Sequence, residues 1–286
     1  MEINLKVTPC FGVAGNFTGH LEQAGEAKDF ENVKTAEANA PKALFPTYIP
    51  IAPEQIVDEN IVPLFLHNFP FDADKIIFPK GEQKVQIEPE CAVICDLTWE
   101  NEKVTAVKPR YFGASNDCSI RKDGAKKISI KKNWGQSSKG LSNHLIGIDK
   151  FSSGGILDNY RIASFLVRDG IAHPYGEDSA VRDYSYIYEK LINWITDKLN
   201  NQKDEGPAEG INRYLNACKC PQQIMISIGA TRYTDYGEHN FLQDGDKSVV
   251  AVYPESKYTP EQIQTLVESE SFFDQEISFL SQQIVL

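Results

Sequence analysis

Short apolar segments separated by turn-forming residues recur along the chain from about residue 75 and predict β-strands. Branched and aromatic side chains are frequent in these segments, as is typical of strands. The expected strands cover residues 75–78, 85–97, 127–131, 162–168, 223–228 and 248–253. The sequence shows no internal repeat, so the strands are expected to form one irregular β-rich body.

Two segments follow helical spacing instead. Residues 186–195 place apolar side chains three and four positions apart, which predicts an amphipathic helix. Thr259 followed by Pro260 and Gln262 has the pattern of an N-cap, a first helical position and a capping box, so a last helix is expected to begin there. Residues 200–210 are polar and contain Gly and Pro, which indicates an exposed loop.

The first part of the chain has a different character. Residues 1–70 contain few clear strand patterns and many Ala and Pro residues, so we expect a small N-terminal lobe with short elements. Residues 71–286 are then expected to form the main, β-rich domain.

Two carboxylates stand two positions apart inside the apolar segment of residues 85–94. Because side chains of a strand alternate, Glu88 and Glu90 would share one face, with Cα atoms about 7 Å apart. Two like charges at that distance favour a hard divalent cation between them, although a solvated sheet face would also accept them. Pro89 removes a ladder donor and predicts a bulge or a strand edge at this point.

Further oxygen and nitrogen groups follow at a distance along the chain. Asp117 comes after an apolar segment and would supply a third hard ligand, or would form a turn together with Asn116. Lys139 lies in a Gly- and Ser-containing loop, where it would reach an anionic or carbonyl ligand or remain solvated.

The order of these pieces resembles the fumarylacetoacetate hydrolase family. They are, in chain order, Gly15-Asn16-Phe17 with His20, Glu88 with Glu90, Asn116-Asp117 with Ser119 and Arg121, Trp134 with Lys139, Gly229-Ala230-Thr231, and Gly245-Asp246. The resemblance implies an α+β fold, a mixed β-sandwich roll with a few peripheral helices. It also implies that residues 71–286 form a metal-binding catalytic β-roll, and that the protein is a homodimer.

The same resemblance implies an activity. Glu88, Glu90 and Asp117 would hold Mg²⁺, or Mn²⁺ or Ca²⁺ in its place, and the substrate would be a small anionic 2-oxo or 2,4-dioxo acid. The ion would stabilise an enolate during C–C hydrolysis, decarboxylation, hydration or isomerisation. The remaining roles are catalytic groups at His20, Lys139 and Glu22, and substrate-binding groups at Asn16, Arg121 and Thr231.

One departure from the family pattern bears on catalysis. Gln23 stands where the family has a glutamate three residues after the histidine, and Glu22 is displaced by one position. Because positions two apart on a helix do not share a face, Glu22 would not naturally orient His20, and Glu26 is the other nearby carboxylate. The departure favours either an enzyme in which decarboxylation or tautomerisation exceeds hydrolysis, or an inactive member that binds a metal or small molecule.

Charge and composition exclude some partners. The net charge of −11 argues against nucleic acid and anionic membranes. The sequence shows neither a signal peptide nor an apolar segment long enough to span a membrane, so a cytoplasmic protein is expected. The six cysteines are accordingly expected to be free thiols. An unrelated sugar-binding β-domain would need aromatic side chains along one exposed face, whereas the aromatics here fall mainly within apolar segments.

Overall fold

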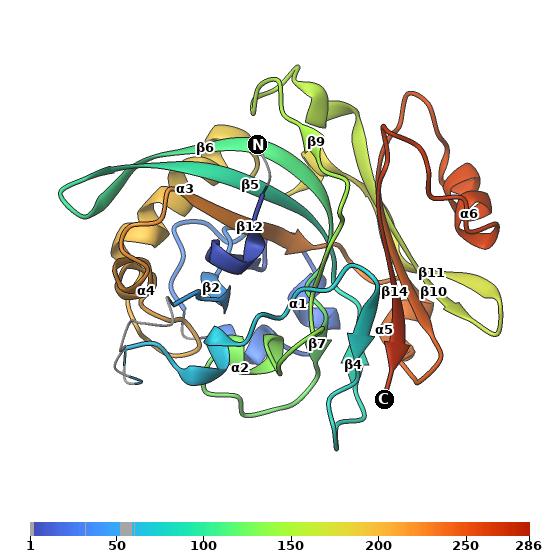
Figure 1. Cartoon of the computed structure of the whole chain (residues 1–286), viewed down its shortest axis with the longest axis horizontal. Helices are drawn as coiled ribbons and strands as arrows, with labels where there is room; N and C mark the ends of the chain where they lie inside the picture. Colours follow the sequence, from blue (N-terminus) through green and yellow to red (C-terminus); the bar gives the residue numbers. More distant parts are fainter. Residues whose placement is uncertain (1–2, 32, 52–58, 60) are drawn as a thin grey trace.

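The computed structural model describes residues 3–31, 33–51, 59 and 61–286. Within these residues the larger sheet has seven strands in the order β2–β1–β12–β5–β6–β8, with β9 also paired to β6. Its strands are β1 (Cys10–Ala14), β2 (Ala43–Tyr48), β5 (Pro89–Glu100), β6 (Lys103–Asn116), β8 (Gly140–Leu141), β9 (Ile146–Gly147) and β12 (Gln223–Ala230). This sheet curls strongly, and its long β5–β6 hairpin arches over the other elements (Figure 1).

The smaller sheet has five strands in the order β11–β10–β13–β14–β3. They are β3 (Lys75–Ile77), β10 (Tyr160–Arg168), β11 (Ile171–Ala180), β13 (Lys247–Pro254) and β14 (Ser278–Val285). A separate short pair joins β4 (Val85–Gln86) to β7 (Ser119–Ile120). Both large sheets combine parallel and antiparallel pairs, and the helices lie outside them, as in an α+β architecture.

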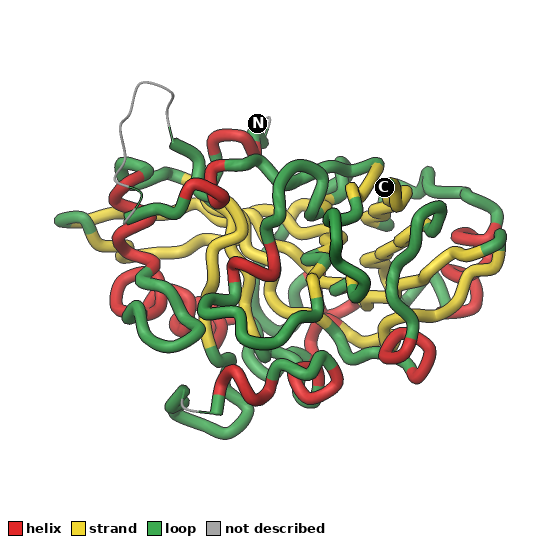
Figure 2. The backbone as a smooth tube through the Cα atoms, turned by 90° about the horizontal axis from the view of Figure 1, so that it is seen from below, coloured by secondary structure: helices red, strands yellow, loops and turns green. Residues whose placement is uncertain are grey.

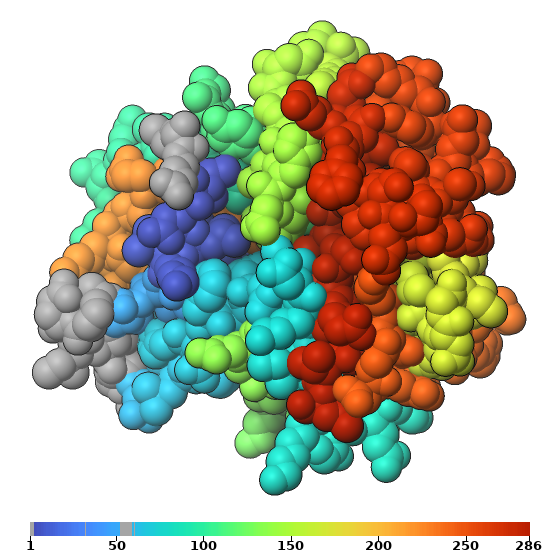
Figure 3. All heavy atoms as spheres, turned by 45° about the vertical axis from the view of Figure 1, so that its right-hand side comes forward, coloured from blue at the N-terminus to red at the C-terminus, as the bar shows by residue number. Residues whose placement is uncertain are grey.

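The two sheets share one apolar core. Phe112 on β6 packs edge-on against Tyr160 of β10, with ring centres 4.8 Å apart, and belongs to the same buried cluster as Ile162, Val250 and Leu280 of the smaller sheet. The segment after β8 also bridges the sheets, because the Ser278 hydroxyl donates to the backbone oxygen of His144 at 2.6 Å. Figure 3 shows this yellow-green segment against the red C-terminal part of the chain.

Helices lie along the outer edges, and strands run through the middle of the molecule (Figure 2). The α-helices are α1 (His20–Gln23), α2 (Ser129–Lys132), α3 (Tyr188–Asn201), α4 (Ile211–Ala217), α5 (Asp235–His239) and α6 (Pro260–Glu268). Short 3₁₀ helices are η1 (Leu5–Val7), η2 (Ala27–Phe30), η3 (Leu64–His67), η4 (Ile156–Asn159) and η5 (Val181–Asp183). In the described part of the chain, no helix is long and apolar enough to cross a membrane.

Most of the secondary structure predicted from the hydrophobic pattern is confirmed. The helix α3 buries Leu191, Ile195 and Leu199, which are spaced four residues apart on one face. The helix α6 begins at Pro260 and has the complete predicted capping box between Thr259 and Gln262.

Two predicted strands are wrong in whole or in part. Residues 127–131 were expected to be a strand, but α2 (Ser129–Lys132) is a helical turn there. Residues 85–97 form two strands rather than one, because the chain leaves the β4–β7 pair before Glu88 and enters β5 at Pro89. The predicted bulge or edge at Pro89 therefore corresponds to a change of sheet.

The division at residue 70 stays a prediction. The N-terminal residues nonetheless take part in the larger sheet, since β1 pairs in parallel with β12 and antiparallel with β2. The pairing joins Cys10 to Met225, so segments more than two hundred residues apart lie side by side in one sheet.

The helix α2 is anchored by a buried acid. The Ser129 hydroxyl donates to Glu209, which is 2% exposed, and the Ile128 amide donates to the backbone oxygen of Pro207. Burial raises the pKa of Glu209 to about 8. The carboxyl group is therefore mostly protonated at neutral pH.

This anchor predicts a pH-dependent loss of stability. The pKa of Glu209 is higher in the folded protein than in the unfolded chain, so the protonated form favours folding. This contribution to the unfolding free energy is complete below about pH 4.5 and is lost as the pH rises through about 8. At about 1.4 kcal/mol per pKa unit, the loss amounts to a few kcal/mol. Urea unfolding of the wild type and of Glu209→Gln from pH 5 to 9 measures it. The wild type should lose stability relative to the variant; parallel curves would refute the assignment.

Candidate active site

The antiparallel register of β5 and β6 brings three acidic side chains together. Pro89 pairs with Asn116, so Glu88 and Glu90 flank that pair and Asp117 directly follows it. The Asp117 amide donates to the backbone oxygen of Glu88 at 3.0 Å. Each of the three residues offers one carboxylate oxygen within 4.8 Å of the others, and all are buried. We call Glu88, Glu90 and Asp117 the acidic triad.

An irregularity of strand β12 at Gly229 completes the triad's surroundings. The β5–β12 register shifts between Ser227 and Ala230, and the Gly229 amide in the shift donates to Glu90 Oε2 at 2.7 Å. Gly229 has φ near +125°, and a Cβ there would lie 2.9 Å from the Cβ of Asn16. A glycine is required at this position by both conformation and space.

Lysines from two elements contact the triad. Lys132 on α2 contacts Glu88 and lies 2.8 Å from Asp117 Oδ2. Lys139, immediately before β8, lies 3.0 Å from Asp117 Oδ1 and donates to the backbone oxygen of Cys118. Both lysine side chains are almost completely buried. The buried carboxylates of the triad are therefore paired with buried lysine side chains.

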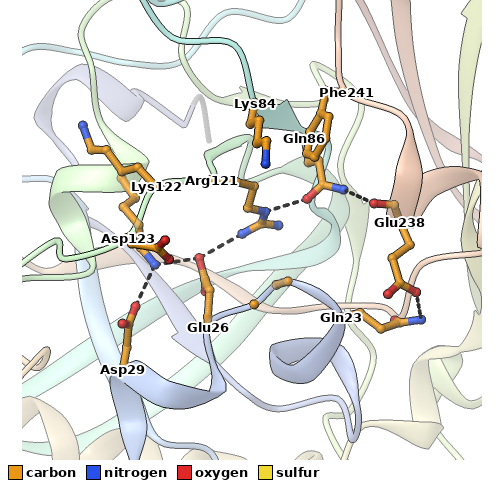
Figure 4. Close-up of a pocket in the computed structure, with 13 residues that line it drawn as sticks. Gln23, Glu26, Asp29, Lys84, Gln86, Arg121, Lys122, Asp123, Glu238 and Phe241 are labelled. Carbon is orange, nitrogen blue, oxygen red and sulfur yellow. Dashed lines mark hydrogen bonds and ion pairs between the residues drawn. The ribbon is translucent and has the colours of Figure 1, made fainter.

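Arg121 joins the triad to an outer cluster of polar groups. Its guanidinium lies 2.8 Å from Glu88 Oε1 and 2.9 Å from Glu26 Oε1, and it donates to Gln86 at 2.7 Å and to the Tyr233 hydroxyl at 2.6 Å. Figure 4 shows Arg121 pointing between Gln86 and Glu26. Such a planar donor group, bound on several sides, holds its partners in fixed positions.

The acids of the triad differ in their protonation. Burial alone would raise the pKa of Glu88, but Lys132 and Arg121 outweigh burial, so the pKa is lowered and Glu88 is ionised. Burial raises the pKa of Glu90 well above its usual range, and the charges of Asp117 and Glu88 raise it further. Glu90 thus takes up a proton far more readily than Glu88.

His20 at the start of α1 faces the triad with one nitrogen. Its Nδ1 lies 2.8 Å from the backbone oxygen of Thr231, which accepts only if Nδ1 carries the proton. Nε2 then has the lone pair, and it lies 4.0 Å from Glu88 Oε1. Burial lowers the pKa of His20 despite the nearby charge of Glu88, so the neutral base predominates.

The residue that replaces the family's glutamate has a different partner. Gln23 donates to the backbone oxygen of Tyr233 at 3.1 Å and to Glu238 at 3.2 Å, and it accepts from the Tyr233 amide at 2.9 Å. A backbone carbonyl, rather than a side chain at position 23, therefore orients His20.

The other predicted site residues lie at varied distances from the triad. Asn16 is buried, and its side-chain amide forms hydrogen bonds with the backbone of Tyr186 and Ile228. It therefore holds the strand next to Gly229. Thr231 Oγ1 is buried and has no hydrogen-bond partner among the described residues. Glu22 is exposed on α1. The proposed roles of these residues stay predictions.

Several site residues were not predicted from the sequence. The predicted strand of residues 127–131 contains Lys131 and ends just before Lys132, so it gives no reason to place both lysines at one site. Both are buried, and Lys131 lies 2.9 Å from Glu26 and 3.0 Å from Asp29. No sequence motif marks Gln86 and Tyr233, because their role is to accept hydrogen bonds from Arg121 and depends on where that residue lies in the fold.

The donor chemistry of the triad fits a divalent metal ion. Carboxylate oxygens are the ligands that Mg²⁺, Mn²⁺ and Ca²⁺ prefer. Glu88 Oε1 and both oxygens of Asp117 lack a hydrogen-bond partner among the described residues, although cationic groups lie at ion-pair distance. Glu88, Glu90 and Asp117 are thus the residues that would hold such an ion.

A polar pocket of about 220 Å³ opens beside this buried site. Lys84 and Lys122 line it together with Arg121 and Glu26 (Figure 4). Lys131 also belongs to its lining. Arg121 and Glu26 belong both to the pocket wall and to the network around Glu88, so the pocket lies next to that network.

Comparison with known proteins gives a family. A model described as "Family of unknown function (DUF5718)" matches residues 26–284. The chain belongs to this family. No curated protein matches the sequence of this DUF5718 member.

Solved structures show the fold. A protein called Cg1458, crystallised with an inhibitor, is 17% identical over 97% of this chain and 77% of that chain, with a TM-score of 0.55. A putative fumarylacetoacetate hydrolase family protein from Yersinia pestis CO92 is 13% identical over 97% of this chain and 93% of that chain, with a TM-score of 0.53. A 2-keto-3-deoxy-D-arabinonate dehydratase complexed with magnesium and 2,5-dioxopentanoate is 13% identical over 97% and 73%, with a TM-score of 0.52. The DUF5718 member has the fumarylacetoacetate hydrolase fold, which confirms the predicted fold class.

The network around Glu88 predicts a large cost for removing Arg121. Arg121→Met would leave two buried carboxylates without their shared partner, which costs about 3–5 kcal/mol of unfolding free energy. Chemical denaturation measures the change. Arg110→Met is the control, because Arg110 forms a half-exposed pair with Asp96 at 3.3 Å and should cost less than about 1 kcal/mol. Equal losses in the two variants would contradict this account.

Proposed function

We propose that this DUF5718 member is a divalent-metal-dependent enzyme acting on a small 2-oxo or 2,4-dioxo carboxylic acid through an enolate. The observation that carries the proposal is the buried acidic triad with a neutral histidine beside it. A protein of the same fold, though only 13% identical, is complexed with magnesium and 2,5-dioxopentanoate, and this supports the choice of substrate class.

The chemistry divides between a cation and the chain's own groups. A divalent cation held by Glu88, Glu90 and Asp117 would polarise the keto oxygen of the substrate and supply charge for the enolate. His20 Nε2 is the free base closest to that point, 4.0 Å from Glu88 Oε1, and would take a proton from the substrate or from water. The Thr231 carbonyl keeps the other nitrogen protonated, which fixes the active tautomer.

Two cationic side chains would serve the substrate in different ways. Lys139 holds a positive charge against Asp117 and would stabilise negative charge that develops on a substrate oxygen. Arg121 is already bound by carboxylate and amide groups, so it would position Glu88 and the pocket wall. Lys84 and Lys122 line the pocket and would attract an anionic substrate toward it.

The missing glutamate favours reactions that need little from a base. The Thr231 carbonyl orients His20 but does not stabilise its protonated form as a carboxylate would. Decarboxylation and tautomerisation depend mainly on an electron sink, so they should exceed hydrolysis of an acylpyruvate. The second candidate is an inactive member that binds a metal or small molecule, and the neutral amide of Gln23 favours it.

Metal binding is the first test. Mg²⁺ or Mn²⁺ at a hundredfold excess over its dissociation constant should stabilise the protein by about 2.7 kcal/mol. Thermal melts against a chelator measure this shift, and Glu90→Gln should remove most of it because one of the triad's ligands is lost. Melts that no divalent cation changes would remove the basis of the proposal.

Turnover is the second test. With Mn²⁺ or Mg²⁺ present, oxaloacetate decarboxylation should exceed hydrolysis of acetylpyruvate and fumarylpyruvate. His20→Asn and Lys139→Met should lower kcat by about 10²- to 10⁴-fold. His144→Asn is the control, because His144 is exposed and contacts the backbone at Gln275. Absence of turnover would favour the inactive candidate, and hydrolysis that survives His20→Asn would place the base elsewhere.

A further inference from the structure

Lys132 is placed where a cation of the triad would be. Its ammonium group contacts Glu88 Oε2 and lies 2.8 Å from Asp117 Oδ2, so it bridges two of the three acids. Lys139 contacts Asp117 alone, from the opposite carboxylate oxygen. With a side chain 3% exposed, Lys132 is shielded from water on nearly all sides.

A divalent ion would need the same oxygens. Mg²⁺ and Ca²⁺ take carboxylate oxygens at about 2.0–2.6 Å, so an ion bound by Glu88 and Asp117 would lie almost where the Lys132 nitrogen lies. Two positive charges that close, in a buried site, repel strongly. The ammonium group and the metal ion are therefore alternatives at one position.

We propose that Lys132 is the resident counter-cation of the acidic triad and that a divalent metal ion binds only by displacing its ammonium group. The proposal rests on the proposed function in one respect, namely that the triad is a metal site. It adds that the chain carries its own competitor, so the measured metal affinity includes the cost of breaking the Lys132 contacts.

The surroundings of α2 indicate how the displacement occurs. The helix itself is held by Ser129 on Glu209 and by Lys131 on Glu26 and Asp29, so the backbone has little freedom to move away. A small cavity of about 10 Å³ adjoins the Lys132 side chain and extends from Glu88 and Glu90 of the triad to Glu26 and Phe45. The space is that of about one water molecule, which suits a rotation of the side chain.

Two features of that cavity would receive a displaced ammonium group. The Lys132 nitrogen already lies 5.2 Å from the centre of the Phe45 ring, a distance at which a cation is attracted to the ring face. Glu26 supplies a carboxylate on the same cavity wall. Lys132 would exchange its contacts with the triad for an acid and an aromatic face.

Lys131 provides a matched control. It is the neighbouring lysine on the same helix and is equally buried, but its partners are Glu26 and Asp29 rather than the triad. Lys131→Met therefore removes one buried lysine charge from α2, as Lys132→Met does, but it leaves the ammonium group at the metal position in place.

The experiment measures Mn²⁺ and Mg²⁺ binding to metal-stripped protein by calorimetry, with no substrate present. Lys132→Met should bind Mn²⁺ at least tenfold more tightly than the wild type, whereas Lys131→Met should stay within about threefold of it. The melting temperature of Lys132→Met should also depend strongly on metal, because without the lysine the triad needs another cation. Lys132→Gln, a shorter neutral variant, should behave in the same way if the methionine variant folds poorly.

The outcomes separate this inference from the proposed function. Affinity unchanged in both Lys132 variants, or tightened as much in Lys131→Met, would overturn the displacement. No binding by any variant would overturn it together with the metal site. Tight binding by Lys132→Met without turnover of any 2-oxo acid would support the displacement and refute the proposed activity.

Discussion

Charge compensation around Glu88 is the constraint on which the rest of the site depends. An ionised carboxylate that is almost completely buried is tolerated only when cations surround it, and here Lys132 and Arg121 do so. These two residues come from different segments, one on α2 and one after β7. Through Arg121 the same compensation extends to Glu26, near the N-terminus, and to Tyr233, which pairs with Gly176 of β11 in the smaller sheet. The network thus fixes how segments distant in sequence meet.

The backbone provides a second layer of positioning that side-chain chemistry alone would not reveal. The Thr231 carbonyl orients His20, and the Gly229 amide donates a hydrogen bond to Glu90. The backbone at the irregular end of β12 therefore positions both the base and an acid of the triad. This stretch of backbone orients His20 although residue 23 is a neutral glutamine rather than a glutamate. Because a carbonyl is uncharged, this positioning does not extend to the electrostatics of a protonated histidine.

The local pattern was sufficient to predict both longer helices and the strands β3, β10, β12 and β13, since apolar periodicity reflects which face is buried. It did not predict β1, β2, β6, β11 or β14, because Pro, Gly or polar residues interrupt their apolar pattern. The alternation of a strand places Glu88 and Glu90 on one face, but it was the ordered resemblance to the fumarylacetoacetate hydrolase family that joined Asp117 to them. Lys132 could not be predicted, since residues 127–131 alternate like a strand and only tertiary contacts decide that α2 forms there. The same applies to Gln86 and Tyr233, whose importance comes from a neighbour more than thirty residues away along the chain.

The parallel pairing of β1 with β12 has a consequence for how the protein folds. Cys10 pairs with Met225, so the ordering of the sheet's centre waits for a contact between residues more than two hundred positions apart. Closing so large a loop is entropically costly and slows folding relative to chains with local contacts. During synthesis the N-terminal strand would remain without its central partner until β12 has emerged from the ribosome. His20 and Glu90 both depend on residues 229–231, so the chemistry of this site exists only after that late event.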